Sequence, residues 1–320
     1  MATQNSDKLE PLEIITSEEA VRQAMELVEE GRNPNPNYLV TRWKGVNRAL
    51  SGGFRFAEIY IIAGGSGVGK SYFLNQLVWS FLSKKLNGRF AKPFKILYFS
   101  FEMRAAAEML RTTSTITGMK YANIISGGEE NKLTDEGYEK VKAAMNILKH
   151  PDLMYVESTG NVYQMYKTVE RVKTAYPDHE IVVACDHSLL PDYFKEKSEV
   201  ELIGNVSKLA LKLKKKLKCM VIFLAQLNDK IEEPHRIRDE HLHYPTKTDV
   251  HGGKSIYHAG DTVIALHSPE ILGIELYGPK QFPTIGLIAA HFLKVRNGNP
   301  GLTRLKNMLD QGKIVSWPET

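Results

Sequence analysis

The chain has 320 residues, of which 42% are hydrophobic and 25% are charged. These fractions are those of a globular protein with a substantial core, and they exclude a disordered or low-complexity chain. No apolar run is long enough to cross a membrane and the N-terminus has no signal pattern, so we expect a cytoplasmic protein without a membrane partner. The net charge of +5 permits nucleic acid as a partner without requiring it.

The N-terminal region predicts one short helix ahead of the folded domain. Thr16 and Glu19 have the spacing of a capping box, and Gly31 provides a stop, so we expect a helix over residues 17–30. Residues 33–37, rich in Asn and Pro, are typical of a linker. We therefore divide the chain into residues 1–37 (tail, helix and linker) and one folded domain over residues 38–320. The helix either folds back on this domain or docks on a neighbouring subunit.

From residue 38 onward, strand patterns alternate with helix patterns. This alternation predicts an α/β fold with a mostly parallel, twisted sheet covered by helices on both faces. We expect strands at residues 58–63, 95–100, 153–157, 180–186, 220–225, 261–266 and 285–293. We expect helices near residues 71–84, 103–117, 134–148, 161–175 and 198–217. Cys185 and Cys219 lie in two apolar strand runs, which predicts buried thiols and no disulfide. Residues 229–256 form a long polar loop of the kind that often carries function.

A glycine-rich turn of the pattern G-x-x-x-x-G-K-S follows the first of these strands and precedes a helix. Its glycines let a phosphate approach the backbone, whose N–H groups and helix dipole favour an anion. Lys70 would reach the β- and γ-phosphates of a nucleoside triphosphate, and the Ser71 hydroxyl would bind Mg²⁺. The turn predicts a nucleotide site made of Gly64, Gly65, Ser66, Gly67, Val68, Gly69, Lys70 and Ser71.

Three further strands end in polar side chains that a nucleotide-hydrolysing site needs. Asp186 ends a buried strand at the edge where ligands collect in open α/β sheets, and it is a candidate Mg²⁺ ligand. Glu102 could polarise the attacking water, although the same position equally fits a glutamate in the first turn of a helix. Gln226 could hydrogen-bond the γ-phosphate and report its loss to the following loop; the alternative is an amide satisfied by local backbone.

Lys294 and Arg296 follow the last predicted strand and point to the same side of it. Paired charges there commonly solubilise an edge strand. The alternative is an arginine finger that acts on the nucleotide of a neighbouring subunit.

Taken together and in this order, the motifs resemble those of the DnaB-type replicative helicases. The similarity lies in the phosphate turn at 64–71, the S-x-E-M segment at 99–103, Asp186, the Q-L-N segment at 225–228, and the K-x-R-x-G segment at 294–298 with Gly301. Residues 249–261 also resemble the acidic stretch that follows the DNA-contacting loop of that family. The resemblance covers residues 40–315, the motor domain of the family.

The resemblance implies a RecA-like ATPase that uses ATP and Mg²⁺, forms a ring that is expected to be a hexamer, and moves on single-stranded DNA. It implies that Lys70 and Ser71 bind phosphate and Mg²⁺, Glu102 is the catalytic base, and Asp186 binds Mg²⁺. It further implies that Gln226 senses the γ-phosphate and that Lys294 and Arg296 act in trans. DNA would pass loops near residues 188–200 and 229–256, and primase, a helicase loader or other replisome proteins would be partners.

The sequence departs from the family pattern in several places. Asp229 stands where the family has Arg, and His187 stands where it has Tyr. The segment Gly252-Gly253-Lys254 lacks the Arg and Glu common there, yet its backbone N–H groups and Lys254 remain candidates for DNA phosphate contacts.

A second departure lies at the N-terminus. The helical domain of bacterial family members has no counterpart in residues 1–40, which favours a phage or plasmid origin and, for a phage protein, the host cytoplasm. The helix at 17–30 is expected to act as the family's linker helix, which docks on an adjacent subunit. The remaining alternatives are a RecA- or RadA-like recombinase, a regulatory ATPase, and a nucleotide-gated loading or binding protein.

Overall fold

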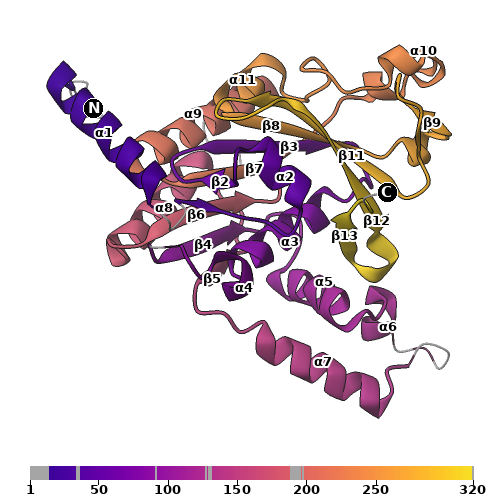
Figure 1. Cartoon of the computed structure of the whole chain (residues 1–320). Coiled ribbons are helices and arrows are strands. Elements are labelled where there is room, and N and C mark those ends of the chain that lie inside the picture. Colours follow the sequence, from indigo (N-terminus) through magenta and orange to yellow (C-terminus); the bar gives the residue numbers. More distant parts are fainter. Residues whose placement is uncertain are drawn as a thin grey trace, which may run out of the picture.

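The computed structural model describes residues 14–33, 37–90, 92–126, 128, 132–187, 196 and 198–318 (Figure 1). The start of the tail and the centre of the predicted linker, residues 34–36, lie outside this part of the chain. Among the described helices, none is long and apolar enough to cross a bilayer.

Within the described residues the main sheet has nine strands, in the order β13-β12-β11-β8-β3-β7-β6-β4-β5. Six neighbouring strands, from β8 to β5, run parallel. These six are β3 (Ile59–Gly64), β4 (Phe94–Phe99), β5 (Leu153–Val156), β6 (Glu180–Cys185), β7 (Met220–Gln226) and β8 (Thr262–His267). All six were predicted from the sequence and are confirmed, with ends shifted by at most one residue.

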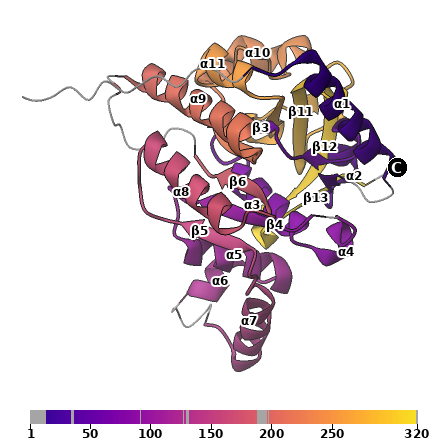
Figure 2. The ribbon, with the colours of Figure 1, turned by 90° about the vertical axis from the view of Figure 1, so that its left-hand side faces the viewer.

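Helices cover both faces of this sheet, as predicted (Figure 2). The bounds of the main helices are α3 (Lys70–Phe81), α5 (Ala105–Thr117), α7 (Asp135–Ile147), α8 (Val162–Ala175) and α9 (Glu199–Leu217). Side chains of β3 alternate between the two faces. Tyr60 and Ile62 join the core under α3, whereas Ile59 and Ile61 join the core under α8 and α9. Continuous burial of a strand on both sides is what a parallel sheet requires.

The antiparallel edge of the sheet was only partly predicted. Strand β11 (Leu287–Val295) pairs antiparallel with β8, and β12 (Gly301–Met308) and β13 (Lys313–Ser316) extend the sheet beyond it. The last two strands were missed because only a few of their side chains are buried, so apolar alternation is weak. Trp43, near the start of the domain, stacks on Phe73 and donates a hydrogen bond from Nε1 to the Ile314 carbonyl at 2.9 Å. This contact ties the beginning of the domain to its last strand.

Several short elements were also absent from the prediction. They are the helices α2 (Lys44–Ala49), α4 (Lys84–Asn87), α6 (Tyr121–Ile125), α10 (Pro234–Arg238) and α11 (Gly253–Ala259), and the two small sheets β1 (Tyr38–Leu39) with β2 (Phe54–Arg55) and β9 (Leu276–Tyr277) with β10 (Phe282–Pro283). The expectation of one long loop over residues 229–256 is therefore wrong. That segment contains short helices and is held by Tyr277, whose hydroxyl donates to the His243 carbonyl at 3.3 Å.

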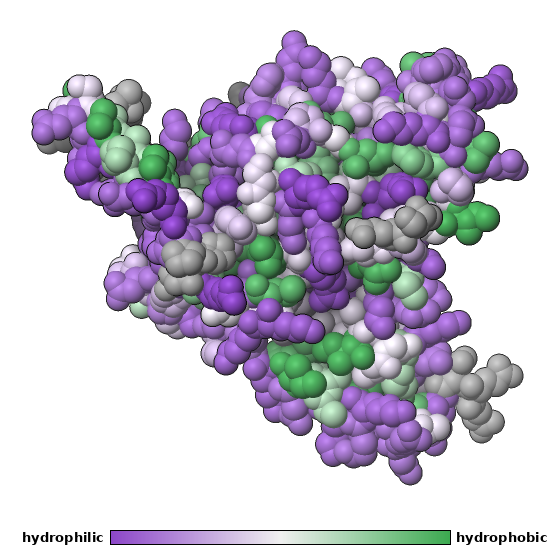
Figure 3. Space-filling model, viewed as in Figure 1, coloured by the Kyte–Doolittle hydropathy of each residue, from purple (hydrophilic) through white to green (hydrophobic). Residues whose placement is uncertain are grey.

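The predicted N-terminal helix is confirmed as α1 (Ser17–Arg32), which extends one residue past Gly31. Thr16 caps it by accepting a hydrogen bond from the Glu19 backbone N–H. None of the residues of α1 is buried, and the helix projects from the body of the molecule (Figure 1). Its exposed surface carries hydrophobic side chains (Figure 3), namely Val21, Met25, Leu27 and Val28.

Candidate functional site

The phosphate loop lies between β3 and α3, as the motif predicts. Gly67 and Gly69 have backbone φ values of +73° and +91°, which residues with a Cβ atom rarely adopt. Lys70 Nζ donates hydrogen bonds to the carbonyls of Gly64 at 2.9 Å and Gly65 at 2.7 Å. Burial lowers the pKa of Lys70, partly offset by Glu102. The loop is thus folded around a lysine whose ammonium group is held over the turn.

The register of the parallel strands brings the other predicted groups to this loop. Gly64 at the end of β3 is paired with Gln226 at the end of β7, and Cys185 at the end of β6 is paired with Phe99 of β4. The carboxyl ends of these strands border a cavity of about 260 Å³. Its walls are formed by Ser66, Gly67, Gly69, Lys70, Ser71, Tyr72, Glu102, Arg111, Asp186, His187, Leu224, Ala225, Gln226 and Leu309. One cavity therefore collects the predicted phosphate, metal and catalytic residues.

Asp186 is buried at the floor of this cavity and accepts hydrogen bonds from the backbone N–H groups of Phe101 at 3.0 Å and Glu102 at 3.3 Å. Burial raises the pKa of its carboxyl to about 6, against the opposing effect of these two hydrogen bonds. A carboxylate that is costly to leave charged and buried is suited to a bound cation, which stabilises the anion. Ser71 lines the same cavity, and its hydroxyl together with the Asp186 carboxylate is a donor set that fits Mg²⁺.

Glu102 lies in the bend between β4 and α5, three residues before the helix begins at Ala105. The predicted helix start at residue 103 is therefore too early, and the alternative of a glutamate in the first helical turn is wrong. Glu102 lines the same cavity as the phosphate loop. This position allows Glu102 to act on a water molecule beside the γ-phosphate.

Gln226 contacts His187, one of the residues that depart from the family pattern. Its Nε2 lies 3.2 Å from Nε2 of His187. An amide nitrogen can only donate, so the histidine nitrogen accepts. Burial lowers the pKa of His187, which favours the neutral ring that can accept this bond. The Gln226 carbonyl also accepts from the backbone N–H of His251, so the predicted sensor is joined to the segment before α11.

Arg111, Tyr72 and Leu309 are among the cavity residues that sequence reasoning did not assign to the site. Arg111 of α5 is paired with the buried Glu108 at 3.0 Å, and its guanidinium lies 5.0 Å from the centre of the Tyr72 ring. Tyr72 directly follows the phosphate motif, and this adjacency could have marked it. Leu309 comes from the turn between β12 and β13, and only the fold brings it here.

Lys294 and Arg296 lie toward the amino ends of the parallel strands, away from the phosphate loop. Because β11 runs antiparallel to β8, Lys294 faces Val263 near the start of β8. Val263 pairs with Ile61 of β3, so Lys294 lies about 10 Å along the strands from Gly64, where the phosphate loop begins. Arg296 NH1 lies 3.2 Å from an oxygen of Asp261, yet 59% of its side chain is exposed. The pair is remote from the nucleotide cavity of its own chain, and its predicted action in trans stays a prediction.

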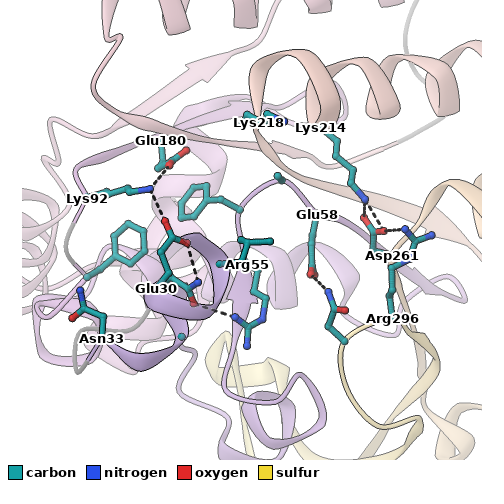
Figure 4. Close-up of a pocket in the computed structure, with 17 residues that line it drawn as sticks. Glu30, Asn33, Arg55, Glu58, Lys92, Glu180, Lys214, Lys218, Asp261 and Arg296 are labelled. Atoms are coloured by element: carbon teal, nitrogen blue, oxygen red, sulfur yellow. Dashed lines mark hydrogen bonds and ion pairs between the residues drawn. The ribbon is translucent and has the colours of Figure 1, made fainter. Parts of the chain in front are cut away.

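A larger groove of about 710 Å³ runs along the amino ends of the parallel strands beneath α1 (Figure 4). Glu30 of α1 and Glu180 of β6 both pair with Lys92, at 3.4 and 3.5 Å. Arg296 lies at the other end of the groove with Asp261 (Figure 4). The exposed arginine therefore shares a surface with the C-terminal end of α1.

The predicted DNA-contact residues lie at the start of α11. Gly252 caps this helix with a φ of +85°, Gly253 is its first residue, and Lys254 is exposed. Most of the predicted DNA loop at 188–200, namely residues 188–195 and 197, lies outside the described residues. The contacts of these residues with DNA stay a prediction.

Comparison with known proteins identifies the family. Residues 39–313 match the family model of the DnaB-like helicase C terminal domain. The replicative DNA helicase DnaB of Buchnera aphidicola subsp. Baizongia pistaciae (strain Bp) is 23% identical over an alignment of 238 residues, and the match covers 72% of this chain and 46% of that protein. The chain thus spans about half the length of this relative.

Solved structures agree on the fold. A solved ATPase domain superposes with a TM-score of 0.79 at 16% identity, covering 96% of this chain and 100% of that domain. A DnaB-like replicative helicase, solved in a study of its interactions with primase, gives a TM-score of 0.78 at 17% identity, covering 95% of this chain and 69% of that one. The fold is therefore the RecA-like α/β fold expected from the sequence. With nearly the whole chain inside the family model, this protein belongs to the DnaB-like helicase C-terminal domain family.

Proposed function

We propose that this chain is the ATP-hydrolysing motor of a ring-shaped replicative helicase that moves on single-stranded DNA and unwinds duplex. One observation supports this most. The cavity and the exposed Arg296 lie at opposite ends of the parallel strands, so Arg296 can serve as an arginine finger only for the cavity of another copy of the chain. A hexameric ring supplies such a neighbour to every subunit.

In this proposal each residue of the cavity has one task. The phosphate loop and Lys70 hold the β- and γ-phosphates, and Ser71 and Asp186 hold Mg²⁺. When bound, Mg²⁺ would neutralise charge that develops on the phosphates. Glu102 takes the proton of the attacking water, and Gln226 binds the γ-phosphate until it leaves.

Subunit contacts complete the motor. Lys294 and Arg296 act on the neighbour's site, with Arg296 reaching the phosphate because its guanidinium is the more exposed of the two. The exposed hydrophobic side of α1 docks on an adjacent subunit, as the linker helix of the family does. Lys254 with the backbone of Gly252 and Gly253 contacts DNA. Primase, a helicase loader or other replisome proteins are the proposed partners.

The first test is steady-state ATP hydrolysis with and without single-stranded DNA, beside a Glu102→Gln variant. We expect strong stimulation by DNA, and a loss of about 10²-fold or more in the variant with nucleotide binding retained. Unwinding of a forked duplex follows as the second test. Turnover that is indifferent to DNA would refute the helicase proposal and favour a nucleotide-gated loading protein. The family match does not favour a recombinase or regulatory ATPase.

A further inference from the structure

Helix α11 runs between the two ends of the parallel strands. Before the helix, the backbone N–H of His251 donates to the backbone carbonyl of Gln226 at 2.8 Å, at the carboxyl ends of the strands, where the nucleotide cavity lies. After the helix, the backbone N–H of Asp261 donates to the backbone carbonyl of Ile59 at 2.8 Å, at the opposite, amino ends of the strands. A seven-residue helix with Lys254 near its start therefore lies between Gln226 and the region of Arg296.

The side chain of Lys294 caps the C-terminal end of this helix with hydrogen bonds. Its ammonium group donates hydrogen bonds to the carbonyls of Tyr257 and His258, each at 3.2 Å, and to that of Gly260 at 2.5 Å. Tyr257 and His258 belong to the last turn of α11 and Gly260 directly follows it, so the cation also meets the negative end of the helix dipole. The Tyr257 hydroxyl makes a second link by donating to the Leu293 carbonyl at 3.2 Å. Helix α11 and strand β11 are thus fastened together by contacts running in both directions.

Asp261 fixes the side chain of Arg296 in the same region (Figure 4). Its carboxylate is buried and accepts from the Ile59 backbone N–H at 2.9 Å and from Lys214 Nζ at 2.6 and 2.7 Å. Arg296 NH1 lies 3.2 Å from one of its oxygens, and the Arg296 backbone N–H donates to the Asp261 carbonyl at 3.0 Å. Asp261 directly follows Gly260, the residue after α11, so Asp261 links the end of α11 to Arg296.

We propose that Lys294 is a positioning residue, which clamps α11 to β11 so that the DNA-contacting start of α11 and the Arg296 side chain move as one unit. This inference rests on the proposed function for the identity of the DNA contact and of the trans arginine. Its structural part, the clamp, concerns the free protein. In this chain the three carbonyls already occupy the donors of Lys294. Lys294 accordingly serves the neighbour's site through α11 and Arg296.

The clamp is tested by amide hydrogen exchange of the full chain without nucleotide or DNA. In Lys294→Met, the amides of residues 257–260 should exchange about tenfold faster or more, because the last turn of α11 loses its cap. Lys294→Arg keeps donors and should restore most of the protection. Lys173→Met is the matched control, since Lys173 Nζ binds the carbonyls of Pro177 and His179 beyond α8. It should leave these amides unchanged. Wild-type exchange in Lys294→Met would overturn the clamp.

A second variant covers the case in which Lys294→Met does not fold. Tyr257→Phe removes only the hydroxyl that reaches the Leu293 carbonyl. It should accelerate exchange of the same amides by a smaller factor, about threefold. If this variant also leaves them unchanged, the fastening of α11 to β11 is refuted.

Functional readouts separate positioning from direct contact with phosphate. Lys294→Met should weaken single-stranded DNA binding several-fold and lower the DNA-stimulated kcat, with KM for ATP unchanged. Arg296→Ala should lower kcat and leave DNA affinity intact. A Lys294→Met variant that behaves like Arg296→Ala would show direct action on the phosphate and refute positioning. If the wild-type protein shows no DNA-stimulated hydrolysis, the proposed function fails, and the exchange measurement still decides the clamp.

Discussion

Two buried histidines, His267 and His291, should make the stability of this protein depend on pH. The Tyr277 hydroxyl lies 2.7 Å from His267 Nδ1 and 2.9 Å from His291 Nε2, so one hydroxyl joins β8 to β11. Burial lowers the pKa of both histidines to about 3, and the nearby Arg236 also lowers that of His267. Both rings are therefore neutral in the folded state at every pH above about 4.

The sign of the effect follows from the direction of these shifts. In the unfolded chain a histidine titrates near pH 6.5, so acidification protonates the unfolded state first and favours it. Stability is fully present above pH 6.5 and falls progressively as the pH drops toward 3. Between pH 7 and pH 5.5 the free energy of unfolding should fall by about 1 kcal/mol for each histidine, and by about 2–3 kcal/mol for the two together. Asp186 acts in the opposite direction, because burial raises its pKa to about 6.

The assay is urea unfolding at pH 7.0 and 5.5 at one ionic strength, comparing the wild type with the double variant His267→Gln, His291→Gln. The contribution of Asp186 is common to both proteins and cancels in the comparison. We expect the variant to be less stable at pH 7 and to lose about 2 kcal/mol less on acidification. Equal losses in the two proteins would refute the buried, neutral histidine pair.

Three further predictions concern the nucleotide site and assembly. An equal mixture of Arg296→Ala and Glu102→Gln subunits should retain about a quarter of the DNA-stimulated hydrolysis, because random pairing leaves that share of interfaces with both residues. If the arginine acted within its own chain, the mixture would be inactive. Gly69→Ala should cost about 1–2 kcal/mol in thermal unfolding and weaken nucleotide binding, since Gly69 has a φ of +91° and its Cβ would lie 2.9 Å from Leu309. Wild-type affinity and stability would contradict this. Deleting residues 1–36 should lower the native mass by abolishing the oligomer, and an unchanged mass would exclude α1 as the docking element.

The sequence by itself determined the central part of the fold and which polar residues gather at the phosphate loop. The six parallel strands were predictable because each is a short apolar run between strong turn or helix signals. The phosphate loop was predictable because its chemistry is local: glycines, a lysine and a serine within eight residues. Asp186 and Gln226 were placed correctly because the carboxyl ends of parallel strands share one edge of a sheet.

Only the tertiary structure decided features that depend on strands and helices far apart in the chain. Strands β12 and β13 lie at the exposed antiparallel edge, where partial burial erases the apolar alternation that marks a strand. Leu309 and Arg111 reach the nucleotide cavity through contacts between distant elements. The hydrogen bonds of Lys294 to the end of α11 likewise follow from packing, because its charge alone fits both a solvent-facing and a buried role. A local motif fixes chemistry within one turn, whereas the partners of a long side chain are set by the elements that pack around it.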